Sequence, residues 1–199
     1  SWTVKNPSWP INKTWDGSEH VLIDSAAKRA YFGNIGYSPD NIKKYDITSA
    51  ESPVFLLENS HGSLGSSGQQ FVLSEDGTKI YFAASGASGY ALQIVKTSDL
   101  NKETDLALGA YPNAVAIDSA HIYAGKASDP KGVKVYRRSD NIFIREYSFG
   151  SQETLVARGI SSGSHIYAAT NKYLYVLSNT DATVTKLYDF VNDQVYIPP

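Results

Sequence analysis

A glycine–serine motif near the end of the chain has the letters of a hydrolase nucleophile elbow. Residues 159–163 read GISSG, and in such enzymes this pattern holds a serine at a sharp turn between a strand and a helix. Here the motif stands between two strand-like runs of a repeat. Ser161 aligns with the residues that begin the same turn in the other copies, which are Asp24, Ser74 and Asp118. We therefore interpret Ser161 as a turn residue and predict no catalytic residue.

Two other features have residue types that bind ligands. The glycine-rich stretch 62–68 (GSLGSSG) lacks the Gly-Lys-Ser/Thr ending of a phosphate-binding loop, and no helical pattern follows it, so we interpret it as a linker. No two histidines have the spacing that places a metal-binding pair on one strand or helix face; they are His20, His61, His121 and His165. We predict no metal site and no cofactor.

An arginine interrupts a position that is apolar in the other copies of the repeat. Val21 and Val115 stand at this position in two copies, and Arg158 stands there in the fourth. A charge at an apolar position must be paired or must reach water. Polar residues and a tyrosine lie on the approach to the equivalent strands of the other copies. The predicted ligand-binding set is therefore Arg158, Glu19, His20, Gln69, Gln70, Asn113 and Tyr111. The alternative is a structural ion pair of Arg158 with Glu19 or Glu153.

Three tyrosines lie outside the strand-like runs, namely Tyr37, Tyr90 and Tyr111. Exposed aromatic rings beside Asn and Gln suit a protein or a sugar surface, whereas a ring packed on its own loop is the alternative. Most of the 14 tyrosines recur at repeat positions and are expected to pack between repeats.

The elements that position these residues follow from one phrase that occurs four times. The copies are VLIDSAAKRAYFGN (21–34), FVLSEDGTKIYFAA (71–84), NAVAIDSAHIYAGK (113–126) and ARGISSGSHIYAAT (157–170). Each copy begins a unit of 42–50 residues with four short runs, which are rich in β-branched and aromatic residues and separated by turn residues. A repeat of this length built from four antiparallel strands is typical of a β-propeller blade.

The phrases resemble a known family of propeller repeats. FVLSEDGTKIYFAA and the stretch from VLIDSAAKRAYFGN to IKKYDITSAESP are similar to YVTN-type or LVIVD-type repeats, and GAYPNAVAID (109–118) resembles the stretch that leads into their blades. The fourth copy departs from the pattern because ARGISSGS lacks the Asp-Gly turn. The resemblance covers residues 19–190 and implies the architecture.

We predict an all-β fold, a single β-propeller domain over residues 1–199 with four-stranded antiparallel blades. The expected blades are residues 19–60, 69–110, 113–150 and 156–190, with terminal strands in 2–15 and 194–197. Two arrangements remain open. The terminal strands join into a composite fifth blade, or the chain is part of a larger ring that is cut or completed by another copy, with self-association as the consequence.

Composition limits the function without identifying it. The chain has 42% hydrophobic residues, no cysteine and a net charge of −2, so disulfides are excluded and nothing favours a nucleic-acid or membrane partner. No apolar run approaches the roughly 18 residues of a membrane span. A sequon at Asn12 favours a secreted or cell-surface protein, with a cytoplasmic location left open.

We expect a non-catalytic recognition module for a protein or a glycan at one mouth of the ring. The alternatives are a lactonase-like or quinoprotein-like propeller enzyme and a structural module of a longer surface protein.

Overall fold

The computed structural model describes most of the chain between residues 18 and 195. The described residues are 18–34, 41–49, 51–60, 71–86, 89–126, 128, 131–149, 160–161, 165–178 and 183–195. Residues 2–15, Asn12, Tyr37, Gln69, Gln70, Glu153 and Arg158 lie outside this set. The described part of the chain contains no helix that would span a membrane.

Four antiparallel sheets account for all the described strands, and each sheet is built from strands that are consecutive in the sequence. The first contains β1 (Ser18–Asp24), β2 (Arg29–Asn34), β3 (Asn41–Asp46) and β4 (Val54–Ser60). The second contains β5 (Phe71–Leu73), β6 (Lys79–Gly86), β7 (Gly89–Lys96) and β8 (Lys102–Ala107). The third contains β9 (Pro112–Ile117), β10 (His121–Lys126), β11 (Gly132–Arg137) and β12 (Phe143–Ser148). The fourth contains β13 (Ile160–Ser161), β14 (Ile166–Ala169), β15 (Tyr173–Leu177), β16 (Val184–Asp189) and β17 (Gln194–Val195).

The turn residues of the first three copies of the repeated phrase act as the sequence predicts. The Asp24 carboxylate accepts a hydrogen bond from the Ala27 N–H (2.9 Å), and the Ser74 Oγ accepts one from the Lys79 N–H (2.9 Å). The Asp118 carboxylate accepts hydrogen bonds from the N–H groups of two turn residues, at 2.7 and 2.8 Å. Such side-chain acceptors close a tight turn between two strands. The prediction for Ser161 was wrong. Ser161 lies in β13 opposite Tyr167 of β14, the place that Leu22, Val72 and Ala116 hold opposite the tyrosines of the other copies, so it is a strand residue and does not begin the turn.

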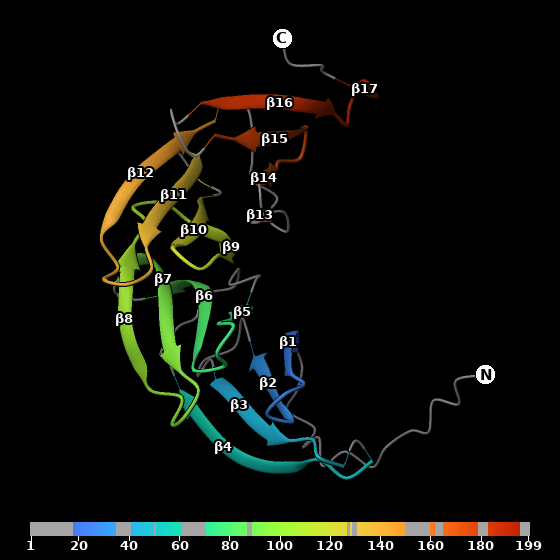
Figure 1. Cartoon of the computed structure of the whole chain (residues 1–199), viewed down its shortest axis with the longest axis vertical. Helices are drawn as coiled ribbons and strands as arrows, with labels where there is room; N and C mark the ends of the chain where they lie inside the picture. The colour runs from blue at the N-terminus through green and yellow to red at the C-terminus, as the bar shows by residue number, and fades with distance from the viewer. Residues whose placement is uncertain are drawn as a thin grey trace, which may run out of the picture.

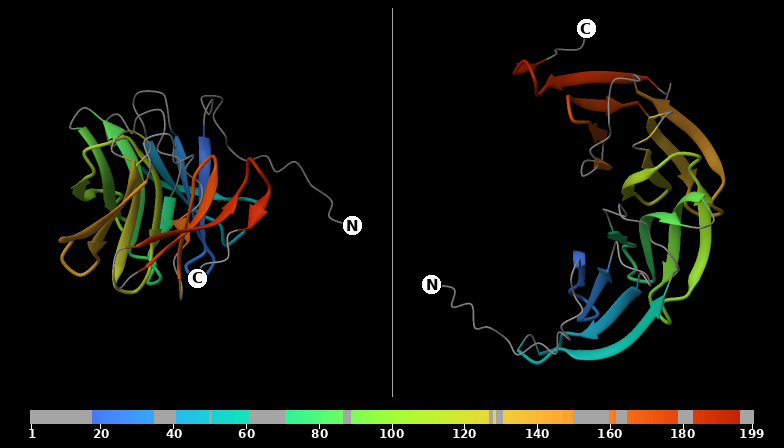
Figure 2. Two further views of the ribbon diagram at one scale, coloured as in Figure 1. Left: turned by 90° about the horizontal axis from the view of Figure 1, so that it is seen from above. Right: turned by 180° about the vertical axis from the view of Figure 1, so that it is seen from behind.

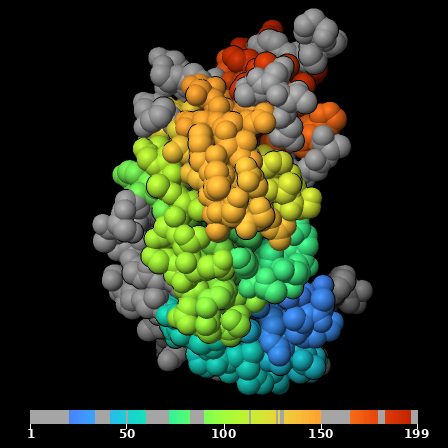
Figure 3. Space-filling model, turned by 60° about the vertical axis from the view of Figure 1, so that its left-hand side comes forward, coloured from blue at the N-terminus to red at the C-terminus, as the bar shows by residue number. Residues whose placement is uncertain are grey.

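The sheets stand side by side in an arc that is open on one side (Figures 1 and 2). The innermost strands β1, β5, β9 and β13 are neighbours, since β1 contacts β5, and β9 contacts both β5 and β13. Successive sheets form a continuous outer surface from the first to the third (Figure 3). We call the face of each sheet that is turned toward the preceding sheet its trailing face, and the opposite face its leading face.

Three apolar clusters fill the spaces between the four sheets, one for each pair of neighbours. The tyrosine of the repeated phrase is on the leading face and enters these clusters in the first three sheets, as Tyr31, Tyr81 and Tyr123. These three rings are almost fully buried, whereas Tyr167 of the fourth sheet is partly exposed. The predicted packing of the repeat tyrosines between blades is therefore observed wherever a following sheet is present.

The C-terminal strand differs from the expected one. We predicted that residues 194–197 begin a further blade, but Gln194–Val195 form β17, which pairs with β16 as the outermost strand of the fourth sheet. The Asp189 carboxylate accepts hydrogen bonds from the N–H groups of Val191 and Asn192, and this turn directs the chain back along β16.

Candidate functional site

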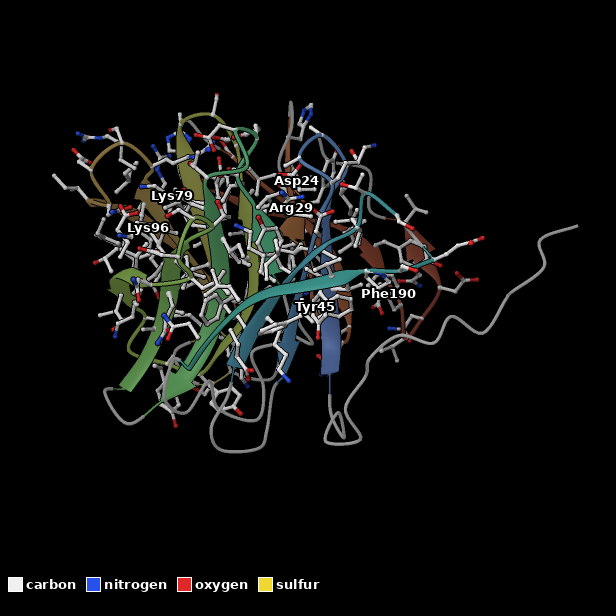
Figure 4. All side chains as sticks on the ribbon, turned by 90° about the horizontal axis from the view of Figure 1, so that it is seen from below. Asp24, Arg29, Tyr45, Lys79, Lys96 and Phe190 are labelled. Atoms are coloured by element: carbon white, nitrogen blue, oxygen red, sulfur yellow. The ribbon has the colours of Figure 1, made fainter. Side chains whose placement is uncertain are left out.

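Each sheet has two ends at which its strands are connected, and the connections differ between these two ends. Asp24, Arg29, Lys79 and Lys96 lie toward the same end (Figure 4). Asp24 ends β1 and Lys79 follows the turn after β5, so both inner strands run toward this end. The turn before β10 is there too, because Arg138 contacts Glu75 of the β5–β6 turn and the carbonyl oxygen of Asp118. We call it the turn end, and the opposite end the linker end.

The described members of the predicted ligand-binding set belong to the linker end. Glu19 and His20 lie within β1 and Asn113 lies within β9, near the start of each strand rather than before it. Tyr111 lies in the connection that leads into β9. Gln69, Gln70 and Arg158 lie outside the described residues, and so does Glu153, a suggested partner of Arg158. The described part of the set is therefore spread over the first and third sheets.

An aromatic pair stands at the linker end, between the second and third sheets. The Tyr90 and Tyr111 rings contact each other edge to face, with centroids 5.3 Å apart and planes at 65°. Tyr90 is 45% exposed, and the Tyr111 N–H donates a hydrogen bond to Ser128 Oγ (2.6 Å), which holds the connection before β9 in place. Tyr90 was predicted to lie outside the strands, but it is the second residue of β7. An exposed ring on a strand is held more rigidly than one on a loop.

A buried ion pair lies beside this connection. Lys126 is opposite Pro112, the residue after Tyr111, and its side chain is 1% exposed. Its ammonium group is paired with the Glu146 carboxylate, which is 24% exposed. Burial, and to a smaller extent the nearby charge of Glu146, raises the pKa of Tyr136 to about 12. The Tyr136 hydroxyl therefore stays protonated and donates to the carbonyl oxygen of Ala107 in the second sheet (2.7 Å).

The turn end carries polar groups that are engaged with one another. The Tyr123 hydroxyl donates to the Asp118 carboxylate (2.6 Å), and His121 Nδ1 lies 3.4 Å from the other carboxylate oxygen. Burial raises the pKa of Asp118, but the hydrogen bonds from Tyr123 and from two backbone N–H groups outweigh it and leave the pKa below its usual value. His121 and His165 each lie against the tyrosine two residues ahead, as expected for a repeat position. Among the described residues, no group of three His, Asp or Glu side chains could hold a metal ion.

Exposed apolar side chains gather at the two open ends of the arc, and this feature was not predicted. Of the exposed large hydrophobic residues, one group lies in the first sheet, namely Val21, Ile23, Val54, Phe55 and Leu56. A second group lies at the end of the fourth sheet, namely Phe190, Val191 and Val195. The first and fourth sheets stand at these two ends (Figure 1). The repeat pattern identifies Val21 and Ile23 as packing positions but does not say that a neighbouring sheet is missing.

The comparison with solved structures agrees with this architecture. The chain is similar to the WD40 repeats of RRP9, with a TM-score of 0.69, 14% identity, and coverage of 86% of this chain and 51% of that one. It is also similar to a protein of unknown function from Desulfotomaculum acetoxidans, with a TM-score of 0.65, 13% identity, and coverage of 89% and 56%. This chain has a β-propeller fold.

A third similar structure is the hydrazine synthase of Kuenenia stuttgartiensis, with a TM-score of 0.63, 13% identity, and coverage of 84% and 53%. The chain thus spans about half the length of the propeller chains it matches. No family profile matches the sequence, and none of the curated proteins compared with it is similar. At these identities the likeness carries the fold and no function.

Proposed function

We propose that this propeller is a non-catalytic recognition module that binds a protein partner at its linker end. The observation that carries the proposal is the Tyr90–Tyr111 pair, an exposed edge-to-face contact on the second and third sheets. Tyrosine offers a large contact area and a hydroxyl at a small cost in conformational entropy, and it is enriched where proteins bind proteins. The Lys126–Glu146 pair beside it carries no net charge as a pair.

The predicted residues at the same end extend this surface. Glu19, His20 and Asn113 begin the inner strands that surround the mouth, and Gln69, Gln70 and Arg158 stand at the equivalent places in the sequence of the other two sheets. The proposal includes the finer YVTN-type or LVIVD-type relationship of the repeats and a secreted or cell-surface location, the latter supported by the sequon at Asn12.

The test compares capture of partners by the chain and by two variants. The wild-type chain is used to capture a protein from an extract of the source cells. We expect Tyr90→Ala to recover about tenfold less of that protein, or less still, because loss of an interface anchor weakens binding by this much. Ile142→Ala is the matched control, because Ile142 is similarly exposed (53%) but lies in the β11–β12 connection. Equal recovery by Tyr90→Ala and Ile142→Ala would contradict a site at Tyr90.

A glycan is the second candidate, and the same pair supports it because an exposed aromatic face can stack on a sugar ring. A glycan array probed with the chain and with Tyr90→Ala separates the two. Binding to a glycan that Tyr90→Ala abolishes would replace the protein partner by a sugar at the same site. Hydrolysis of a lactone that a chelator stops would overturn the recognition proposal in favour of an enzyme.

A further inference from the structure

The open face of the first sheet repeats the residues of a buried contact. Val21 and Ile23 of β1 occupy the positions of Val115 and Ile117 of β9, on the trailing face. Val115 is fully buried against the second sheet, whereas Val21 and Ile23 are 52% and 55% exposed. The equivalent side chains of the two sheets thus differ in exposure, because a described sheet precedes the third sheet and none precedes the first.

The aromatic residues of that face repeat an internal contact as well. Tyr136 and Phe143 of the third sheet are cross-strand partners in edge-to-face contact, with ring centroids 6.0 Å apart. The Tyr136 hydroxyl also donates a hydrogen bond to the carbonyl oxygen of Ala107 in the second sheet. Tyr45 and Phe55 of the first sheet are partners in the same way, with centroids 5.6 Å apart. Tyr45 and Phe55 are 5% and 48% exposed, close to the 5% and 50% of Tyr136 and Phe143, so this pair repeats the residue types and the contact of the third sheet without differing from it in exposure. The first sheet therefore has the trailing face of a blade that follows another blade.

The open face of the fourth sheet is the matching half of such a contact. Tyr167 and Val176 are cross-strand partners on its leading face, as Tyr123 and Val135 are on that of the third sheet. Tyr123 and Val135 are buried against the fourth sheet, whereas Tyr167 and Val176 are partly exposed. A leading face and a trailing face are the two sides of every contact between sheets in this fold.

A second copy of the chain fits the size of the part that would complete a ring. The chain spans 51–56% of the length of the propeller chains it matches. A second polypeptide of about the same size would therefore complete a propeller of that length. A second copy of the chain has this size and presents both required faces. Two copies related by a twofold axis would make the same contact twice and leave neither face exposed.

We propose that two copies of this chain close a ring, in which the leading face of the fourth sheet of each copy packs on the trailing face of the first sheet of the other. Val21 and Ile23 then pack near Tyr167 and Val176 of the second copy, as Val115 and Ile117 pack near Tyr81 and Ile94 inside the chain. This closure is independent of the proposed partner site, because Tyr90 and Tyr111 lie between the second and third sheets.

The first test is the mass of the 199-residue chain in solution at several concentrations, by light scattering after size exclusion. We expect a species of twice 21.7 kDa that dissociates on dilution. A monomer at every concentration would overturn the proposal and leave the open faces to further blades of a longer chain or to another protein. A species larger than two copies would overturn the twofold closure.

Variants on the two faces test where the copies meet. Ile23→Lys is expected to raise the dissociation constant about 30-fold or more, the loss typical of an interface hot spot, because it places a charge at the contact. Ile23 is exposed in the single chain, so its fold and circular dichroism should be unchanged. Ile142→Lys should dimerise normally, because Ile142 is similarly exposed but lies in the β11–β12 connection of the third sheet. A normal dimer of Ile23→Lys would contradict the contact.

Mixing two defective variants provides a sharper test. Val176→Glu alters the leading face only, and Ile23→Lys alters the trailing face only, so each homodimer contains two damaged contacts. In a mixed dimer one contact is wild type and the other brings Glu near Lys. We expect an equimolar mixture to dimerise more tightly than either variant alone. A mixture no tighter than its components would exclude the head-to-tail arrangement.

Discussion

Single residues at the linker end combine charge and burial in a way that can be measured. Lys126 is buried and its partner is Glu146, so removing the carboxylate leaves an ammonium group without compensation in an apolar setting. We expect Glu146→Gln to lower the free energy of unfolding by about 3 kcal/mol, at the lower end of the range for buried pairs because Glu146 keeps some exposure. Urea denaturation measures this. The double variant with Lys126→Met should lose less than Glu146→Gln alone, and an equal or larger loss would contradict the pairing.

Asp118 makes stability depend on pH at the turn end. Its pKa in the folded chain lies below its usual value, because hydrogen bonds from Tyr123 and two backbone N–H groups outweigh the effect of burial. Its contribution is therefore complete above the unfolded-state pKa of about 4 and is lost as the pH falls through the lower folded-state pKa.

The variant Asp118→Asn should flatten the acid side of the stability profile. At neutral pH it is expected to cost about 1.5 kcal/mol, since the amide oxygen still accepts the two backbone hydrogen bonds, whereas the amide nitrogen that replaces Oδ2 cannot accept the one from the Tyr123 hydroxyl. Thermal unfolding at a series of pH values measures both effects. Asp140→Asn is the control, because Asp140 is an exposed turn residue. A profile for Asp118→Asn that keeps the wild-type slope below pH about 4 would contradict this role.

At the scale of the strand, the start of β11 requires a residue without a side chain. A Cβ atom on Gly132 would overlap the carbonyl oxygen of Tyr147 in β12 and lie 3.3 Å from the Cα of Ser148. These atoms belong to the backbone, so only a separation of β11 from β12 could relieve the overlap.

We expect Gly132→Ala to lower the free energy of unfolding by about 2 kcal/mol, measured by urea denaturation. Gly109→Ala is the comparison, because Gly109 has a φ of 70° and a methyl group added there would meet nothing within 4 Å. Its expected cost is about 1 kcal/mol and comes from backbone conformation alone. A smaller loss for Gly132→Ala than for Gly109→Ala would show that β11 and β12 are not held this closely.

Strands and turns could be predicted from the sequence because the same order of strand-forming and turn-forming residues occurs four times. Asp24, Ser74 and Asp118 accept hydrogen bonds in their turns as expected. Tyr90 was placed outside the strands, yet pairing with Ser85 of β6 extends β7 to include it. The aromatic contact of Tyr90 with Tyr111 joins two units of the repeat, and a pattern within one unit does not contain such a contact.

For the whole molecule, the repeat predicts how one blade meets the next but not how many blades there are. Every sheet has a leading and a trailing face with apolar residues at the repeat positions, so the contact can be repeated. The composite fifth blade was one solution that the sequence left open. In the structure, β17 adds to the fourth sheet instead, and the faces marked by Val21 and Tyr167 stay open. The repeat pattern is the same in an inner sheet and in an end sheet, which explains why the number of blades could not be predicted.

Closure by a second copy has a thermodynamic consequence for the whole molecule. Val135 and Val176 occupy equivalent positions, but only Val135 is buried within one chain. Val135→Ala should lower the melting temperature by about 5 °C at any protein concentration, from a loss of about 2 kcal/mol in a chain of this size. Val176→Ala should approach that loss only at concentrations where the wild type is dimeric, because association then stabilises the fold. Calorimetry across a dilution series measures both, and a cost of Val176→Ala that does not change with concentration would exclude burial of the fourth sheet by a second copy.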